Sequence, residues 1–395
     1  MTQPSDRHKR RTNTSSLTEL ALLFLKLGVI GFGGPAAHIA MMEDEVVRRR
    51  RWLSQEEFLD LLGATNLIPG PNSTELAIHI GHRRAGWPGL VIAGSCFILP
   101  AAIMVGAIAW AYVQYGSLPQ ASALLYGVKP VIIAIIAQAL WRLGHTALKT
   151  IWLAIVGVIG VVLTLFGVNE LAVLFAAGAV VSLSRWLASL KGKHRTLFSF
   201  APAPMTLLTQ AAGAAATSAT SFGLLPLFLF FLKVGSVLFG SGYVLLAFLR
   251  ADLVERWHWM TDGQLLDAIA VGQITPGPVF TTATFIGYVL GGSKGAVVAT
   301  AGIFLPAFVF VALSGPLVPR IRKSKVAGAF LDGVNAASMS LMAVVTYWLA
   351  RSTLVDVVTV GLAAVSLILL VRFKLNSAWL VLAGAVAGLL SFLWR

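Results

Sequence analysis

The chain has 395 residues, of which 57% are hydrophobic and only 12% are charged. A soluble domain carries about 25% charged residues, so this composition leaves too little polar surface to coat a globule and excludes a water-soluble fold. Uncharged apolar runs of about 20 residues, the length that a bilayer core requires, recur along the sequence. We therefore expect an all-α polytopic membrane protein.

The formal net charge of +14 would suggest a nucleic-acid partner if the protein were soluble. Here the Arg and Lys residues lie mostly in short stretches between apolar runs, where they orient a membrane protein and meet anionic headgroups. We expect membrane lipid and no nucleic acid as the partner of these charges. The lone Cys96 lies inside an apolar run, so no disulfide forms within the chain.

Four regions follow one another along the sequence. Residues 1–16 form a polar, basic tail, and no small-residue cleavage site ends the apolar run after it, so we expect a first membrane helix and not a signal peptide. Residues 17–188 and 224–395 form two transmembrane units, joined by a basic linker at 189–223. Each unit offers six apolar segments, near 17–42, 58–80, 87–113, 121–141, 151–168 and 170–187, and near 224–249, 265–290, 296–317, 328–349, 354–371 and 378–394.

The two units are copies of one sequence. Phe24-Leu-Lys26-Leu-Gly28 recurs 207 residues later as Phe231-Leu-Lys233-Val-Gly235, and the same offset joins the two Pro-Gly-Pro motifs at 69–71 and 276–278. Beyond these motifs the offset is 206, and it aligns Leu99-Pro100 with Leu305-Pro306. Such an ordered series indicates an internal duplication.

The distribution of basic residues favours opposite orientations for the two units. If all twelve segments cross the membrane, Lys and Arg divide almost evenly between the two sides. A strong bias appears if 207–222 adds a thirteenth crossing, or if each Pro-Gly-Pro segment is a re-entrant hairpin that leaves five crossings per unit. Both schemes invert the second unit. We expect antiparallel repeats, with the choice between the schemes open.

The duplicated Pro-Gly-Pro motifs predict broken helices. Two prolines around a glycine remove backbone donors, and proline is well tolerated at the first position of a following half-helix. The N–H groups and positive dipole end of such a half-helix favour an anion, and inverted-repeat transporters place substrate at interrupted helices near the midplane. A kink that only serves packing is the alternative. The predicted binding residues here are Asn66, Pro69, Gly70, Pro71, Thr74, Gln273, Thr275, Pro276, Gly277, Pro278 and Thr281, whose polar members can donate hydrogen bonds to oxygens.

Lys26 and Lys233 form a second candidate feature. Each lies inside an apolar run, where a lysine at the bilayer centre costs about 2.5–3.5 kcal/mol and so needs a role or a partner. We interpret them as fixed cations facing an oxyanion, with snorkelling to the headgroups as the alternative. The glycines that follow, among them Gly33, Gly34 and Gly240, allow close helix packing or backbone donation to a ligand.

Four residues are candidates for proton coupling. His38 has Leu245 as its counterpart in the second unit, and Asp60 and Asp267 recur near the start of the broken helix, where a carboxylate more often caps a helix N-terminus. Glu75 shares one helical face with His79 and His82 at spacings of four and three. We expect that trio to be solvated interface residues and not a metal site.

No enzyme constellation is found in the sequence: there is no Walker loop, His-Glu-x-x-His or Cys pair. We expect neither an enzyme nor a cofactor.

These residues carry a family resemblance. The elements Phe24-Leu-Lys26-Leu-Gly28, Phe32-Gly33-Gly34-Pro35 with His38, Arg51-Trp52-Leu53, Pro69-Gly70-Pro71 and Leu99-Pro100, with their second copies, resemble the chromate ion transporter family in its long, two-domain form. The resemblance spans nearly the whole chain. Two departures are Asn66, where Gln often precedes the Pro-Gly-Pro, and Ser241-Gly242 in place of Gly34-Pro35.

The resemblance implies proton-motive-force-driven export of chromate across the bacterial cytoplasmic (inner) membrane, chromate resistance, and competition by sulfate. An uncoupled channel or an importer for sulfate-type anions is the alternative, and a homo-oligomer is left open.

Overall fold

The computed structural model describes residues 4–32, 34–191, 222–238, 244–373 and 375–393, and within these ranges it contains helices and no strand. The first half comprises α1 (Pro4–Ile30), α2 (Gly34–Glu43), the π-helical turn η1 (Asp44–Arg49), α3 (Gln55–Thr65), α4 (Asn72–Tyr115), α5 (Pro119–Ala147), α6 (Ile151–Leu165) and α7 (Glu170–Lys191). The second comprises α9 (Leu224–Val237), α10 (Leu245–Leu249), the π-helical turn η3 (Arg250–Arg256), α11 (Asp262–Ile274), the 3₁₀ turn η4 (Val279–Thr281), α12 (Thr282–Lys323), α13 (Lys325–Thr353), α14 (Val357–Arg372) and α15 (Ser377–Leu393).

The same order of elements occurs in both halves, down to local details. Both α3 and α11 begin with a capping box, built by Ser54 and Glu57 in the first half and by Thr261 and Gln264 in the second. Such reciprocal side-chain bonds satisfy the free N–H groups of a helix start. The duplicated sequence therefore folds into a duplicated series of helices.

The chain reverses direction between α1 and α2. Lys26 near the end of α1 lies 2.8 Å from Glu45, which follows α2, although an uninterrupted helix would separate residues 19 positions apart by about 28 Å. The equivalent Lys233 and Asp252 also contact each other. The segments near 17–42 and 224–249, each expected as one crossing, therefore fold back on themselves as helical hairpins.

A second hairpin surrounds each Pro-Gly-Pro motif. Arg83 in α4 contacts Glu57 in α3 at 3.0 Å, so the chain reverses between them. With 11 residues, α3 rises only about 16 Å, half of what a bilayer core requires. Helix α3, the break at Pro-Gly-Pro and the start of α4 therefore form a helical hairpin. The alternative crossing at 207–222 lies almost wholly outside the described residues.

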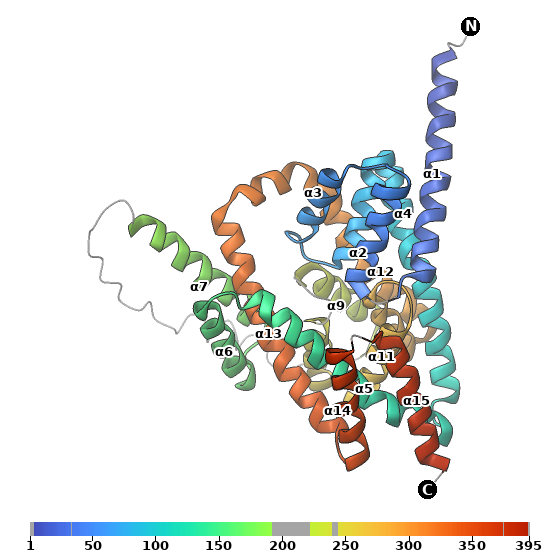
Figure 1. The fold of residues 1–395 in the computed structure, drawn as a ribbon, viewed down its shortest axis with the longest axis vertical. Coiled ribbons are helices and arrows are strands. Elements are labelled where there is room, and N and C mark those ends of the chain that lie inside the picture. Colours follow the sequence, from blue (N-terminus) through green and yellow to red (C-terminus); the bar gives the residue numbers. More distant parts are fainter. Residues whose placement is uncertain (1–3, 33, 192–221, 239–243, 374, 394–395) are drawn as a thin grey trace.

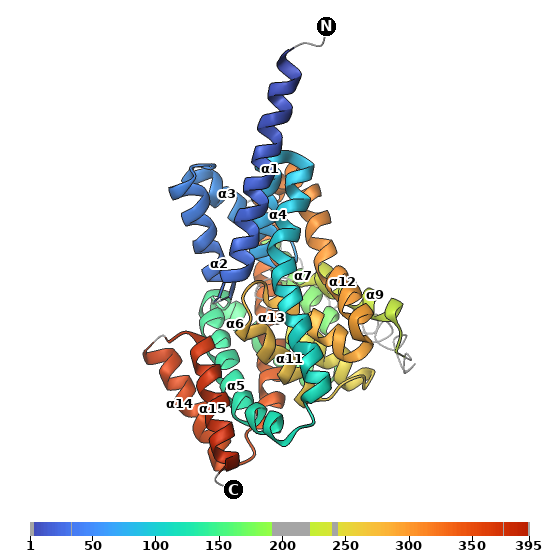
Figure 2. The same ribbon diagram turned by 90° about the vertical axis from the view of Figure 1, so that its right-hand side faces the viewer.

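After each second hairpin, a sharp bend leads into a long helix. In α4 the bend lies at Ala85 and Gly86 (φ 62°, ψ −146°), and in α12 it lies at Gly291 and Gly292 (φ 61°, ψ −153°). Only glycine adopts this backbone conformation readily. Beyond the bends α4 runs downward and α12 upward in both views (Figures 1 and 2).

Helices of the two halves are interleaved. Within each half α1 packs on α4 and α9 on α12, whereas α5 packs against α14 and α15, and α13 against α6 and α7. The long helices α4 and α12 also contact each other. The hydrophobic core therefore lies between the halves and contains helices of both.

Five helices in the described ranges are long and apolar enough to cross a membrane: Asn72–Tyr115, Pro119–Ala147, Glu170–Ala188, Val279–Ser314 and Val326–Thr353. Shorter apolar helices accompany them at Ile151–Leu165, Leu224–Val237, Val357–Arg372 and Ser377–Leu393. The protein is a multi-pass helical membrane protein.

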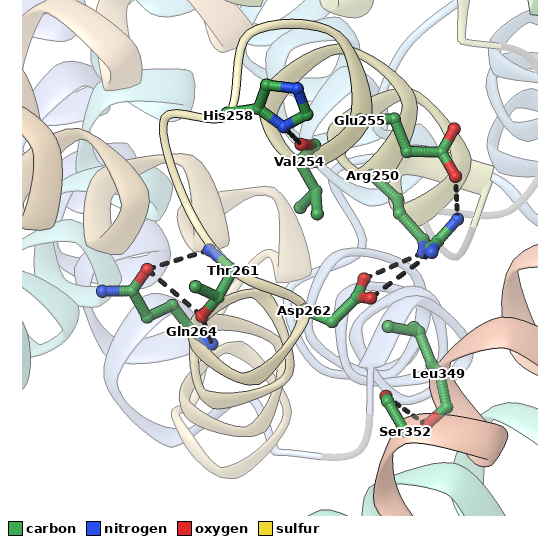
Figure 3. A network of polar contacts seen from close by, with 9 residues as sticks. All are labelled: Arg250, Val254, Glu255, His258, Thr261, Asp262, Gln264, Leu349 and Ser352. Atoms are coloured by element: carbon green, nitrogen blue, oxygen red, sulfur yellow. Dashed lines mark hydrogen bonds and ion pairs between the residues drawn. The ribbon is translucent and has the colours of Figure 1, made fainter.

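A charge network centred on the buried Arg250 connects η3 to α11. The Arg250 guanidinium donates from Nε to Asp262 at 2.8 Å and also contacts Glu255 (Figure 3). Positions 43, 48 and 55 of the first half correspond to these three, and there Glu43 contacts Arg48 and accepts a hydrogen bond from Gln55 at 3.3 Å. The contact between the π-helical turn and the following helix therefore centres on a cation, Arg250, in the second half and on an anion, Glu43, in the first.

Candidate functional site

The hairpin tips of the two halves meet at the centre of the molecule. The Gly70 amide donates to the Leu238 carbonyl and the Gly277 amide donates to the Gly31 carbonyl, each at 2.8 Å. These bonds are equivalent under the 207-residue offset. Each Pro-Gly-Pro tip is thus hydrogen-bonded to the end of the first helix of the opposite half.

Close packing brings the tips together. A Cβ on Gly28 would lie 2.7 Å from the Phe97 carbonyl oxygen, and one on Gly235 would lie 2.4 Å from that of Ile303. Helix α1 therefore approaches α4, and α9 approaches α12, at backbone contact. A Cβ on Gly277 would lie 2.5 Å from the Ala101 side chain, so the second tip sits against helix α4.

Helix α4 begins directly after the first Pro-Gly-Pro, and its early N–H groups face the junction with the dipole's positive end. The Thr74 hydroxyl is fully buried and has no hydrogen-bond partner among the described residues. Asn66 is exposed, and its side-chain oxygen accepts a hydrogen bond from Asn72 at 2.8 Å. These groups surround the first tip, where an anion would be favoured.

The second tip offers fewer free donors than its sequence suggests. The Thr275 hydroxyl donates to the Val271 carbonyl and the Thr281 hydroxyl to the Pro278 carbonyl, both at 2.8 Å. A hydroxyl has one proton to donate, so in this conformation each threonine donates to its own backbone. Gln273, in the last turn of α11, is partly buried.

Both lysines are paired with an acid. Lys26 contacts Glu45 at 2.8 Å, and Arg50 lies 3.3 Å from the same carboxylate. Asp252 contacts both Lys233 and Arg256. Glu45 and Asp252 recur at the same 207-residue offset as the lysines.

His38 ties the first hairpin together. Its Nε2 lies 2.8 Å from the Gly31 carbonyl, and its Nδ1 lies 3.3 Å from the Ser73 hydroxyl. Because a carbonyl only accepts, Nε2 carries a proton. The Gly31 carbonyl oxygen thus accepts hydrogen bonds both from His38 and from the Gly277 amide of the opposite half. Through this shared acceptor, the imidazole is linked to the contact between the tips.

Glu75 and His79 are buried, contrary to the expectation of a solvated face. Glu75 is fully buried and His79 is 8% exposed, because α4 folds back against α1, α2 and α12. Both Glu75 carboxyl oxygens and the His79 Nε2 have no hydrogen-bond partner in the described part of the chain. The structure shows no group of three metal-ligating side chains within that part.

Asp60 and Asp267 do not cap their helices. Ser54 and Thr261 occupy the cap positions, and both aspartates lie further along α3 and α11. Asp267 is buried, accepts a hydrogen bond from Tyr112 at 2.9 Å and lies 3.2 Å from the Lys129 ammonium. This cluster lines a polar cavity of about 340 Å³, whereas Asp60 is exposed.

Gly34 begins α2 with φ 75°, and a Cβ there would meet open space. Gly33 and Gly240, predicted to bind substrate, lie outside the described residues.

The fold is that of a multi-pass membrane protein. At its centre, helices of both halves are interrupted and expose polar backbone groups. The family model described as "Chromate transporter" matches residues 18–183 and again 225–389. The chain belongs to the chromate transporter family.

Curated relatives match over nearly their full length. The chromate transport protein of Cupriavidus metallidurans is 36% identical over 389 residues, covering 96% of this chain and 94% of the relative. The chromate transport protein of Pseudomonas aeruginosa is 35% identical and covers 95% and 93%, and the probable chromate transport protein of Synechococcus elongatus is 32% identical and covers 95% of both chains. No solved structure matches.

Proposed function

We propose that this protein is a secondary active transporter that exports chromate, or a sulfate-like oxyanion, from the bacterial cytoplasm under the proton-motive force and so confers chromate resistance. The family match and the names of the full-length relatives support chromate as substrate. Export, its coupling and the inner-membrane location are parts of the proposal.

One structural observation carries the proposal: the reciprocal bonds from Gly70 to Leu238 and from Gly277 to Gly31. They join the helix breaks of both halves at one central point, as expected of a site shared by two repeats. A tetrahedral dianion there would receive N–H donation from the start of α4, the free Thr74 hydroxyl and, through rearrangement of their ion pairs, Lys26 and Lys233.

The same observation favours an inverted-repeat architecture. Helices α4 and α12 run in opposite directions, and each half contributes two hairpins whose tips reach the junction. In such a protein, one set of hairpins opens the site to the cytoplasm and the other opens it to the outside. His38, Glu75, Asp60 and Asp267 remain the candidates for proton coupling, and the first two lie nearest the tips.

The alternative function is an uncoupled or importing transporter for sulfate-type anions. It follows from the chemistry of the site, since backbone N–H groups and a hydroxyl bind either dianion. Electrogenic anion flux that ignores a proton gradient would favour it.

Labelled chromate movement in inverted membrane vesicles tests the proposal. We expect chromate to accumulate in the vesicles when a proton-motive force is imposed, and excess sulfate to reduce the accumulation. A vector-only membrane preparation is the control. Absence of chromate movement under any gradient would contradict the proposed substrate, and movement unaffected by the gradient would favour the alternative.

A further inference from the structure

Glu75 is the buried acid closest to the first Pro-Gly-Pro tip. It lies in the first turn of α4, four residues after Pro71, and its side chain is fully buried. A Cβ on Gly70 would fall 2.2 Å from Glu75 Oε1, with Ala307 of α12 as the next neighbour. The carboxyl thus occupies the space beneath the tip glycine, between the two halves.

Among the residues that the structure describes, no cation contacts this carboxyl. Neither of its oxygens has a hydrogen-bond partner in the described ranges, and the surrounding cluster is apolar, with Ile68, Ile78 and Ala307 among its members. Titratable groups on the neighbouring elements have other partners: Lys26 of α1 pairs with Glu45, His38 of α2 with Gly31 and Ser73, Glu57 of α3 with Arg83, and Asp267 of α11 with Lys129 and Tyr112. Lys294 of α12 is exposed, and His79, one turn along α4, has an unpaired Nε2 in the described ranges.

An ionised carboxylate in such a place would be very costly, whereas the protonated acid is tolerated. A divalent oxyanion bound at the adjacent tip would raise that cost further, because like charges repel strongly where water is excluded. The anion and the proton on Glu75 therefore favour each other's binding. In the second half the corresponding residue is Thr281, whose hydroxyl donates to Pro278, so the arrangement occurs once per chain.

We propose that Glu75 carries a proton that is bound together with the oxyanion, so that proton and anion cross the protein in the same direction. One proton with a dianion carries one net negative charge, so the membrane potential, negative in the cytoplasm, is the component of the proton-motive force that drives export. The inference rests on the proposed function and names its protonation site. When the tips open to water, Glu75 can ionise, and its charge then promotes release of the anion.

The test uses wild-type protein in liposomes, with the membrane potential clamped at zero by a potassium ionophore and a pH-sensitive dye in the lumen. Sulfate is the probe because it stays a dianion near neutral pH, whereas chromate itself takes up protons there. We expect an inward sulfate gradient to acidify the lumen in proportion to the sulfate that enters. Sulfate entry with no pH change, or with alkalinisation, would overturn the inference.

Variants assign the proton to this residue. Glu75→Gln, a neutral isostere, is expected to keep sulfate exchange without luminal acidification, and Glu75→Asp is expected to keep both. The matched control is Glu56→Gln, which removes an exposed glutamate of α3 and should acidify like wild type. Acidification by Glu75→Gln at the wild-type rate would also overturn the inference. Failure of wild-type protein to move either sulfate or chromate would instead reject the proposed function, and the inference with it.

Discussion

At the scale of single residues, the duplicated lysine–acid pairs set the charge near the site. Lys26 and Lys233 each hold a carboxylate oxygen where an oxyanion's oxygen could bind. The acid therefore neutralises the lysine in this conformation and competes with the substrate anion for it. A lysine so placed can exchange one anionic partner for another without ever being left unpaired in the membrane.

We predict that Lys26→Ala reduces chromate flux by at least about tenfold, since a hydrogen bond to a charged group contributes about 1.5–3 kcal/mol. Protein level should persist because Glu45 keeps Arg50 at 3.3 Å and Arg49 at 3.6 Å. Vesicle uptake of labelled chromate, normalised to protein, measures the effect.

The double variant Lys26→Ala/Glu45→Ala separates the two roles of the lysine. If Lys26 binds the anion, the double variant stays inactive. Recovery of flux would mean that the lysine serves only the ion pair.

Gly70 is predicted to be intolerant of a side chain. Its φ of 139° disfavours other residues, and an added Cβ would collide with Glu75. We expect Gly70→Ala to abolish chromate transport. The control is Gly63→Ala in α3, where a Cβ meets open space and the helix should gain about 0.5–1 kcal/mol. Transport and thermal unfolding of both variants check this, and wild-type transport by Gly70→Ala would contradict it.

At the scale of elements, the unit expected to move is the helical hairpin and not the single helix. Each short helix spans only part of a bilayer and is held by contacts at its open end, such as Arg83 with Glu57, and at its tip. The tips are bonded across the halves, so movement of one hairpin must break or carry a bond to the other half. This arrangement is suited to alternating access.

Gly86 forms the bend that returns α4 from the second hairpin into its long segment. Its φ of 62° and ψ of −146° are almost exclusive to glycine, so Gly86→Ala should destabilise the protein by about 1–3 kcal/mol. Gly106→Ala, further along α4 in open space, should raise stability by about 0.5–1 kcal/mol, as for Gly63→Ala. The midpoint of thermal unfolding in detergent measures both, and equal midpoints would show that the bend relaxes at no cost.

The sequence predicted some of these elements for definite physical reasons. The duplication and the Pro-Gly-Pro breaks were readable because proline and glycine have local effects that tertiary contacts rarely reverse. The first hairpin was not foreseen, because Lys26 and Glu45 are 19 residues apart and only the fold joins them. The caps at Ser54 and Thr261 were readable from their Glu57 and Gln264 partners but were assigned to Asp60 and Asp267 instead.

Burial of Glu75 could not be read from periodicity. In the sequence, a Glu and a His four residues apart near a helix end are typical of solvated residues at the membrane–water interface. In the fold, α4 packs against α1 and α12 and encloses both side chains. Likewise, the hydroxyls of Thr275 and Thr281 look like free donors until the bonds to their own backbone are known.

At the scale of the whole molecule, the proposed inversion predicts opposite exposure of equivalent loops. Ser117 follows α4 and Ser324 follows α12, in the corresponding loops of the two halves. In a Cys96→Ser background, we expect an impermeant maleimide to label only one of Ser117→Cys and Ser324→Cys in intact cells, and only the other in inverted vesicles. Labelling of both from the same side would contradict inversion.

The central claim is that one anion binds where the hairpin tips of both halves meet. The most direct measurement is an experimental structure of the protein with chromate bound, determined alongside the anion-free state. We expect density for a single tetrahedral anion beside Gly70, Thr74 and Gly277, at the start of α4. Density in the cavity beside Lys129 and Asp267 instead, with the tips unoccupied, would contradict the account.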